Sequence, residues 1–575
     1  MSNDPASPAK NLQQAIALHM SGQLDRARSL YEEILALQPR HTEVLGKLAA
    51  LSIQSGNPGR AIELLDKALV LDPTNAVNYC NRGAACERLR QWEGALDNYD
   101  RAIALQPNLA QAHCNRANVL RELRRWRDAL SGYDRAVALQ PGYVNAYNNR
   151  GKVLMELGKF DQALASYDAA IALKPDFADG HYNRAILLGK MGQPELAITS
   201  YDACIALNPN FVHAYVNRGN ELQFLRNWQP ALDSFNRAVA LKPDFADARY
   251  NRGVLRLLLG DYENGWADNE WRQEKLERVG GKRHFTKPAW LGESSLDGKR
   301  ILIHCEQGLG DSLQFCRYVK LLAVAGAQVV LEVPTPLVNL LSGLVGVSQL
   351  VVAGSALPDF DCHCSLMSLP RAFNTKLATI PAQIPYLWVD ETMTLAWRER
   401  LGPKRRLRVG LVWEGGFRPK DKELWDVNSR RNIPLDLLST LKSVDVEFYS
   451  LQKGEPAESE LAKLLEQGWD GLPIKNHTAL IKDFADTAAL IANLDLVVSV
   501  DTSTAHLAGA MGKPVWILNR YDNCWRWLVD RRDSPWYPTA RLYRQKVPGD
   551  WNVVIQAVKT DLAQFAASNP ITHGA

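Results

Sequence analysis

The chain has 575 residues, of which 46% are apolar and 23% charged, and its formal net charge is +4. This length predicts two to four domains. So small a net charge over so long a chain gives no reason to expect a nucleic acid or another polyanion as partner. Nine cysteines without a CxxC pair fit reduced thiols in a cytoplasmic protein. No run of about 18 apolar residues occurs, so we expect no membrane span.

Prolines recur with a period of 34 residues through the first half of the chain, at positions 39, 73, 107, 141, 175, 209 and 243. An alanine series, a mostly aromatic series and a series of small residues share this period. The pattern is that of the tetratricopeptide repeat (TPR), in which each unit forms two short helices. We expect seven full repeats from about residue 8 to 245. A capping unit should begin at 246, because a solenoid must cover its last apolar face.

A stripe of asparagines follows the same period although packing does not require an amide there. Its members occupy the sixth position of successive repeats, on the first helix of each pair, and each is followed by arginine; they are Asn81, Asn115, Asn149, Asn183, Asn217 and Asn251. An amide both donates and accepts, so the stripe can pair with the backbone of an extended polypeptide. The alternative is a set of solvated or inter-repeat asparagines inherited by duplication. The stripe resembles the asparagine ladder of O-GlcNAc transferase, a TPR protein that glycosylates other proteins.

The second half alternates short β-branched runs with helical stretches and therefore predicts an α/β fold. Expected strands are Ile301–Cys305, Gln328–Val333, Gln349–Val352 and Pro385–Val389, then Arg408–Trp413, Val446–Leu451, Leu494–Val500, Val515–Asn519 and Arg541–Tyr543. Two such series predict two Rossmann-like lobes with a cleft between them. The expected domains are a TPR superhelix (1–279), a connector packed by tryptophans (280–299), a first lobe (300–402) and a second lobe (403–575). We expect the final helix, Trp551 to Phe565, to pack across the lobes.

Two strand ends in this half carry candidate chemistry. After the first strand comes Glu306-Gln307-Gly308-Leu309-Gly310-Asp311-Ser312, followed by an expected helix from Leu313 to Leu322. A glycine turn before a helix can bind an anion or place a carboxylate such as Asp311 at a ligand cleft. In the second lobe the run from Leu494 enters Asp501-Thr502-Ser503-Thr504-Ala505-His506. Its hydroxyl and backbone donors at a helix start suit a diphosphate, although an ordinary N-cap uses the same residues.

These motifs, together with HCEQGLGDSLQFCRY, DFDCHCSLMSLP, FYSLQKG and RDSPWYP, resemble a bacterial family that joins TPR repeats to a heptosyltransferase-like GT-B glycosyltransferase domain. The resemblance covers nearly the whole chain. It implies Asp311 as catalytic base and a diphosphate held at Thr502–Thr504 and His506. The donor-binding residues it suggests are Gln307, Gly308, Gly310, Trp413, Arg430, Lys453, Asp501, Thr502, Ser503, Thr504 and His506. Lys420, Lys422 and Arg431 are further candidates on the loop after the second lobe's first strand.

Two other clusters have alternative interpretations. Asp359-Phe360-Asp361 mimics the DxD metal motif of GT-A enzymes, but in this context it fits the start of a strand better. We expect no metal and no cofactor, since GT-B enzymes generally work without a bound metal. The cluster from Trp525 to Trp527 with Arg531, Arg532 and Trp536 could stack a base or sugar, or form a tryptophan-rich core corner with solvated arginines.

The sequence thus predicts a metal-independent, inverting protein glycosyltransferase. Its substrates would be a nucleotide-sugar and a polypeptide acceptor bound through the asparagine stripe and modified on serine or threonine. Flagellin or a surface adhesin is an acceptor by analogy only. The alternatives are a glycosyltransferase acting on lipopolysaccharide or another glycan with the TPR array as scaffold, and a non-catalytic TPR adaptor.

Overall fold

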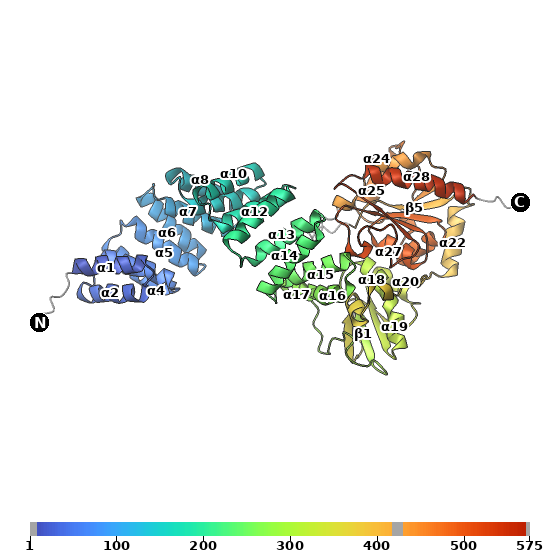
Figure 1. Ribbon diagram of the computed structural model, residues 1–575, viewed down its shortest axis with the longest axis horizontal. Helices are drawn as coiled ribbons and strands as arrows, with labels where there is room; N and C mark the ends of the chain where they lie inside the picture. The colour runs from blue at the N-terminus through green and yellow to red at the C-terminus, as the bar shows by residue number, and fades with distance from the viewer. Residues whose placement is uncertain (1–7, 417–428, 571–575) are drawn as a thin grey trace. The chain divides into compact units, whose positions relative to one another are not determined.

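The computed structural model describes residues 8–416 and 429–570. The chain forms two compact units, Met1–Leu241 and Lys242–Ala575. The first is entirely helical in its described part, and the second combines three further helices with two α/β lobes (Figure 1). Within the described residues, no helix has both the length and the apolar character needed to cross a bilayer.

The first unit is a TPR superhelix of paired antiparallel helices. Its helices are α1 (Pro8–Met20), α2 (Leu24–Leu37), α3 (Thr42–Gln54), α4 (Pro58–Leu71), α5 (Ala76–Arg88), α6 (Trp92–Leu105), α7 (Ala110–Glu122), α8 (Trp126–Leu139), α9 (Val144–Glu156), α10 (Phe160–Leu173), α11 (Ala178–Lys190), α12 (Pro194–Leu207), α13 (Val212–Phe224) and α14 (Trp228–Leu241). Each second helix ends two residues before a repeat proline, which cannot continue the helical hydrogen bonds.

The periodic small residues allow close helix crossing within each pair. A Cβ added at Gly83 would lie 2.7 Å from the Tyr99 ring, and one at Gly219 would lie 2.6 Å from the Phe235 ring. The aromatic side chain therefore fills the space within its own pair. Burial of these rings is nearly complete and supplies much of the core of the array.

In the first unit, the arginine that follows each asparagine of the stripe joins successive repeats. Arg184 donates to Asp168 of the preceding repeat at 2.7 Å and to Ser200 of its own repeat at 2.7 Å. Arg82, Arg116, Arg150 and Arg218 make the equivalent ion pairs with Asp66, Asp100, Asp134 and Asp202. These contacts between repeats explain why an arginine recurs after each of these asparagines.

The second unit begins with the last TPR pair, α15 (Ala246–Leu258) and α16 (Tyr262–Asn269), followed by α17 (Arg272–Arg278). Here the arginine contact changes, because Arg252 pairs with the buried Asp268 of its own repeat at 2.7 Å. The indole of Trp266 donates to the Thr375 carbonyl at 2.8 Å, and that of Trp536 donates to the Tyr262 hydroxyl at 3.1 Å. The last pair is therefore fastened to both α/β lobes.

The N-terminal lobe contains a parallel four-stranded sheet in the order β3-β2-β1-β4. Its elements are β1 (Arg300–His304), α18 (Leu309–Phe315), α19 (Val319–Val324), β2 (Gln328–Val333), α20 (Val338–Leu341), β3 (Val347–Val352), β4 (Cys362–Ser365), α21 (Leu369–Ala372) and α22 (Glu391–Leu401). The strand expected at Pro385–Val389 is absent from this described segment. Instead the N–H groups of Tyr386 and Leu387 donate to the Ala510 carbonyl at 2.9 and 3.3 Å, so the segment lies against a helix end.

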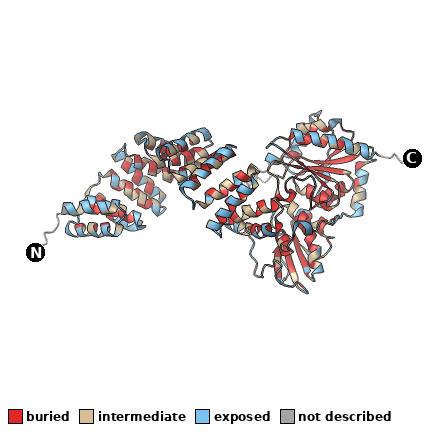
Figure 2. Ribbon diagram, viewed as in Figure 1, coloured by how far each residue is buried: buried red, intermediate tan, exposed pale blue. Residues whose placement is uncertain are grey.

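The C-terminal lobe contains a parallel six-stranded sheet in the order β10-β9-β8-β5-β6-β7, whose strands are buried (Figure 2). Its elements are β5 (Arg408–Val412), α24 (Leu435–Leu438), β6 (Glu447–Ser450), α25 (Ala457–Glu466), β7 (Ile474–Lys475), α26 (Phe484–Ala492), β8 (Leu496–Val500), α27 (Ser503–Ala510), β9 (Val515–Asn519), β10 (Ala540–Arg544) and α28 (Asn552–Ser568). The two-residue β7 was not predicted from the sequence. Helix α28 packs on the core of this lobe through Ile555 and Val558 and does not cross to the other. Two lobes built on parallel sheets are consistent with a GT-B domain.

Candidate functional site

The glycine turn after β1 places Asp311 in the first turn of α18. Its carboxylate accepts a hydrogen bond from the Gly308 N–H at 2.8 Å, which closes the turn and caps the helix. Gln307 is exposed beside it, and Asp311 is partly exposed. The carboxylate thus stands at the carboxyl edge of the parallel sheet, where α/β folds bind ligands.

A buried arginine from the other lobe pairs with this carboxylate. Arg526, in the short helical turn Trp525–Trp527, donates to Asp311 and also, at 2.7 Å, to the side chain of Gln314. Burial alone lowers the pKa of Arg526, but Asp311, Cys524 and Asp501 together outweigh burial and raise that pKa above the usual value. Trp525 and Trp527 are buried, so they form a core corner and not an open stacking surface, while Arg526 is ion-paired and not solvated.

The N-terminus of α27 lies directly against that of α18. A Cβ at Gly310 would lie 2.9 Å from the His506 ring and 3.4 Å from the Cα of Ser503. Only glycine allows this approach without displacement. The two motifs predicted from sequence, Asp311 and the Thr502–Thr504 segment, are therefore brought together at one junction between the lobes.

His506 is an interior residue of this junction. It is 4% exposed, its Nδ1 lies 2.9 Å from the Tyr537 hydroxyl, and its ring stacks on Trp527 at 5.2 Å. Burial lowers the pKa of His506 to about 3, so the imidazole is neutral at physiological pH. It therefore supports the start of α27 but supplies no positive charge to a diphosphate.

The predicted residues on the neighbouring strand ends occupy different environments. Trp413 is 1% exposed and belongs to the core of the C-terminal lobe. Arg430 pairs with Asp522 at 3.1 Å, whereas Arg431 donates to the Asp501 carbonyl at 2.8 Å, next to the start of α27. Lys453 donates to Glu458 at 3.0 Å and to the Thr478 carbonyl at 2.9 Å. Lys420 and Lys422 lie outside the described residues.

A second cluster of charges beside the glycine turn was not foreseen from sequence. Arg272 of α17 is 2% exposed and donates to Glu306 at 2.7 Å, to Glu270 at 2.6 Å and to Ser368 at 2.6 Å. Burial would raise the pKa of Glu306, but the charge of Arg272 together with hydrogen bonds from Arg272 and Ser365 outweighs burial and holds that pKa below its usual value. The cluster joins the helix after the TPR cap to the turn that carries Asp311. No local motif marks it, because Arg272, Glu306 and Ser368 are far apart in sequence.

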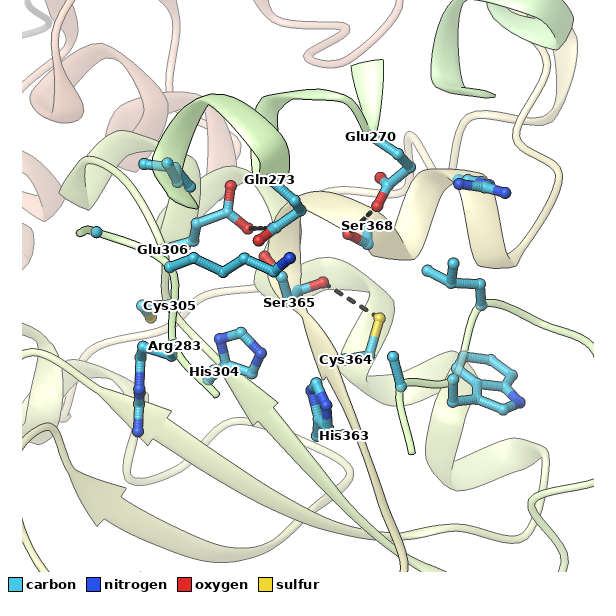
Figure 3. A pocket seen from close by; sticks show the side chains of 17 residues that line it. Glu270, Gln273, Arg283, His304, Cys305, Glu306, His363, Cys364, Ser365 and Ser368 are labelled. Atoms are coloured by element: carbon cyan, nitrogen blue, oxygen red, sulfur yellow. Dashed lines mark hydrogen bonds between the residues drawn. The ribbon is translucent and has the colours of Figure 1, made fainter. Parts of the chain in front are cut away.

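A cavity of about 340 Å³ lies next to this cluster, at the carboxyl ends of β1 and β4. Figure 3 shows the His304 and His363 rings beneath Glu306 and Gln273 on its wall. Both Nδ1 atoms are buried and have no hydrogen-bond partner in the part of the chain that is described. Burial lowers the pKa of His304 to about 4, so this imidazole is neutral. Cys362, His363 and Cys364 belong to strand β4.

The DxD-like motif helps to place the first strand. Asp361 accepts a hydrogen bond from the Arg300 N–H at 2.8 Å, and β4 starts at the next residue. Asp359 and Asp361 thus precede a strand of the N-terminal lobe, as expected.

The asparagine stripe forms hydrogen bonds between repeats. The amide of Asn183 donates to Asn148 at 2.8 Å and that of Asn149 donates to Asn118 at 3.0 Å. Asn115 and Asn217 make comparable contacts with the preceding repeat, at Cys80 and Tyr182. All six asparagines of the stripe are partly exposed. Inter-repeat bonding therefore accounts for part of their recurrence and leaves them accessible to a ligand.

Comparison with known families defines the class of protein. Residues 18–79, 90–123, 133–165, 151–192, 178–211 and 216–265 match models of the tetratricopeptide repeat. Residues 451–527 match the model of glycosyltransferase family 9 (heptosyltransferase), and this match includes α27 and Arg526. The chain combines a TPR array with a glycosyltransferase family 9 domain, an architecture of bacterial TPR glycosyltransferases.

Individual relatives share parts of this architecture. The chain is 26% identical to protein FlbA of Caulobacter vibrioides over 337 residues, which are 55% of this chain and 54% of FlbA. It thus spans about half the length of that relative. Among solved structures, YrrB, described as a TPR protein with an unusual peptide-binding site, is 22% identical with a TM-score of 0.30 and covers 33% of this chain and 98% of its own. MamA is 29% identical with a TM-score of 0.26 and covers 28% and 96%.

Proposed function

We propose that the protein transfers a sugar, with inversion, from a nucleotide-sugar to a serine or threonine hydroxyl of a polypeptide. The observation that carries this proposal is the junction at Gly310, which brings Asp311 beside the start of α27. A hydroxyl that attacks an anomeric carbon must lose a proton, and a carboxylate can take it. The match to glycosyltransferase family 9 across α27 supports the same chemistry.

Asp311 has the geometry for the role of base. Its two oxygens accept one hydrogen bond from Gly308 and one from Arg526. An ionised carboxylate offers about four acceptor positions, so about two stay available for the proton of the acceptor hydroxyl. Arg526 and the turn hold the group in one orientation, and that preorganisation favours proton transfer.

The start of α27 is suited to the leaving diphosphate. Thr502 is extended and precedes the helix, and its hydroxyl lies 2.9 Å from that of Ser499. The first N–H groups of a helix and its dipole favour an anion there. Ser503 and Thr504 add hydroxyl donors, so charge on the departing diphosphate is stabilised by the protein. On this proposal no metal or cofactor is required.

The asparagine stripe would bind the acceptor. Amides that bond to the preceding repeat are fixed in orientation, and a fixed amide row can pair with polypeptide backbone irrespective of sequence. The TPR array itself indicates a peptide or protein partner.

A panel of nucleotide-sugars tests the donor site. Purified protein is melted with uridine, guanosine, cytidine and thymidine nucleotide-sugars, each with and without EDTA. A bound donor stabilises only the folded state, so we expect one class to raise Tm in both conditions. The proposal is overturned if no class raises Tm, or if EDTA abolishes the rise and manganese restores it.

A further inference from the structure

The fifth position of a repeat lies one residue before the asparagine stripe, and at Cys80, Asn148 and Tyr182 its side chain accepts from the asparagine of the next repeat. Asn148 accepts from Asn183 of the next repeat at 2.8 Å, and Tyr182 accepts from Asn217 at 3.2 Å. The Cys80 Sγ accepts from the Asn115 amide in the same way, with Nδ2 and Sγ 3.9 Å apart. In these three repeats the side chain at the fifth position is thus satisfied by the repeat that follows.

Tyr250 holds the fifth position in the last TPR pair, where this partner cannot exist. After α16 the chain forms α17 instead of another first helix with an asparagine. The Tyr250 hydroxyl has no hydrogen-bond partner among residues 8–416 and 429–570, and the residue is partly exposed. Lys275 of α17 lies over its ring at 4.7 Å and fixes the plane of the side chain.

This hydroxyl belongs to the same neighbourhood as Asp311. Helix α15 packs against the turn that carries Arg526. The charges of Arg272, Arg526 and Asp311 act on the Tyr250 hydroxyl, and burial raises the pKa of this phenol. It therefore stays protonated at physiological pH and is available as a donor.

We propose that Tyr250 binds the acceptor polypeptide beside Asp311 by donating a hydrogen bond to it, so that the last TPR pair contributes a substrate contact to the transferase site. This inference rests on the proposed function. A polypeptide that pairs with the stripe at Asn251 would meet the Tyr250 hydroxyl one residue away on the same helix. Binding of the polypeptide, and not binding of the nucleotide-sugar, should depend on this phenol.

The substitution Tyr250→Phe removes one oxygen and tests the proposal. Reduced, carboxymethylated α-lactalbumin, a permanently unfolded protein, serves as the polypeptide probe, labelled for fluorescence anisotropy. We expect Tyr250→Phe to raise its Kd about five- to tenfold. KM for the polypeptide should rise similarly, while KM for the donor and the pH profile stay unchanged. Tyr215→Phe is the matched control, since its hydroxyl donates to the Pro209 carbonyl at 3.4 Å.

The possible outcomes distinguish failure of the proposed function from failure of the Tyr250 inference. If wild-type protein binds or glycosylates no polypeptide, the proposed function fails before Tyr250 is considered. If wild-type protein binds and modifies the probe and Tyr250→Phe does so with the same Kd and KM, the Tyr250 inference is wrong. Equal losses for Tyr250→Phe and Tyr215→Phe would also overturn it. Tyr250→Ala is a second variant, which removes the whole ring. If it binds the polypeptide as wild-type protein does, the inference is also wrong.

Discussion

Arg526 of the C-terminal lobe donates to Asp311 of the N-terminal lobe, so the proposed base is held by a charge from across the interlobe junction. The pair is largely buried, with 9% of the Arg526 side chain and 19% of the Asp311 side chain exposed. Removing one member of a buried pair leaves an uncompensated charge and commonly costs about 3–5 kcal/mol. A single substitution at Asp311 or Arg526 therefore changes both the proposed base and the contact between the lobes.

Asp311→Asn should abolish most of the activity. An amide cannot accept the hydroxyl proton, so we expect the rate to fall about 100-fold or more. The variant should also melt at lower temperature, because Arg526 loses its counter-charge. Asp311→Asn with Arg526→Gln removes both charges and should recover Tm but not activity. Near wild-type turnover in either variant would exclude Asp311 as base.

Gly310→Ala should disturb the junction of α18 and α27. The added methyl would lie 2.9 Å from the His506 ring, and overpacking of this kind typically costs about 1–3 kcal/mol. We expect a lower Tm and weaker nucleotide-sugar binding, measured by calorimetry. Gly343→Ala is the control, because a Cβ there would meet no atom within 4 Å. Unchanged donor binding in Gly310→Ala would contradict the shared site.

Thr504→Val should weaken the donor site with little change in shape. Thr504 is 8% exposed at the start of α27, and its hydroxyl is one of the donors assigned to the diphosphate. A hydrogen bond to a charged group is worth about 1.5–3 kcal/mol, which predicts a loss of donor affinity of about tenfold or more. Thr560→Val, in α28, is the control. Donor affinity equal to that of wild-type protein would remove Thr504 from the site.

The stability of the protein should fall on acidification through His506. Its pKa is about 3 in the folded state, below the usual 6.5, so the unfolded state binds a proton that the folded state does not. Stability is therefore unaffected by this group above about pH 6.5 and decreases from there toward pH 3, by about 1.4 kcal/mol per pH unit at most. His506→Gln should show a shallower decline in urea unfolding between pH 6.5 and 4.5 than wild type. The same slope in both proteins would be inconsistent with a neutral buried imidazole.

The stripe is tested by changing Asn149, Asn183, Asn217 and Asn251 to alanine together. Each amide contributes about 0.5–1.5 kcal/mol, so four should reduce polypeptide affinity by several kcal/mol. Tm should fall as well, because the amides of Asn149, Asn183 and Asn217 also bond to the preceding repeat. Donor binding should be unchanged. Asn108→Ala with Asn210→Ala, both exposed in turns, is the control. Modification of polypeptide at the wild-type rate would favour a scaffold role for the array.

Periodic and local features of this chain were predictable from sequence. The 34-residue period follows from identical packing in each repeat, and it gave the helix pairs and their ends. The strands and the two glycine or hydroxyl motifs were visible because each is contiguous. Contacts between distant segments were not visible: the Arg526–Asp311 pair and the Arg272–Glu306 pair join residues more than 30 positions apart. Burial was not predictable either. Trp413 and His506 are residue types that commonly contact ligands, but both are buried in the folded protein.

The central claim is that this protein moves a sugar from a nucleotide onto a polypeptide at the Asp311 junction. The most direct measurement is the intact mass of carboxymethylated α-lactalbumin, and of a degenerate serine and threonine peptide library, after incubation with each nucleotide-sugar. We predict a mass increase of whole glycosyl residues with one donor class, in the presence of EDTA, that is absent with Asp311→Asn plus Arg526→Gln. No increase with any donor, or an equal increase with the double variant, would contradict the account.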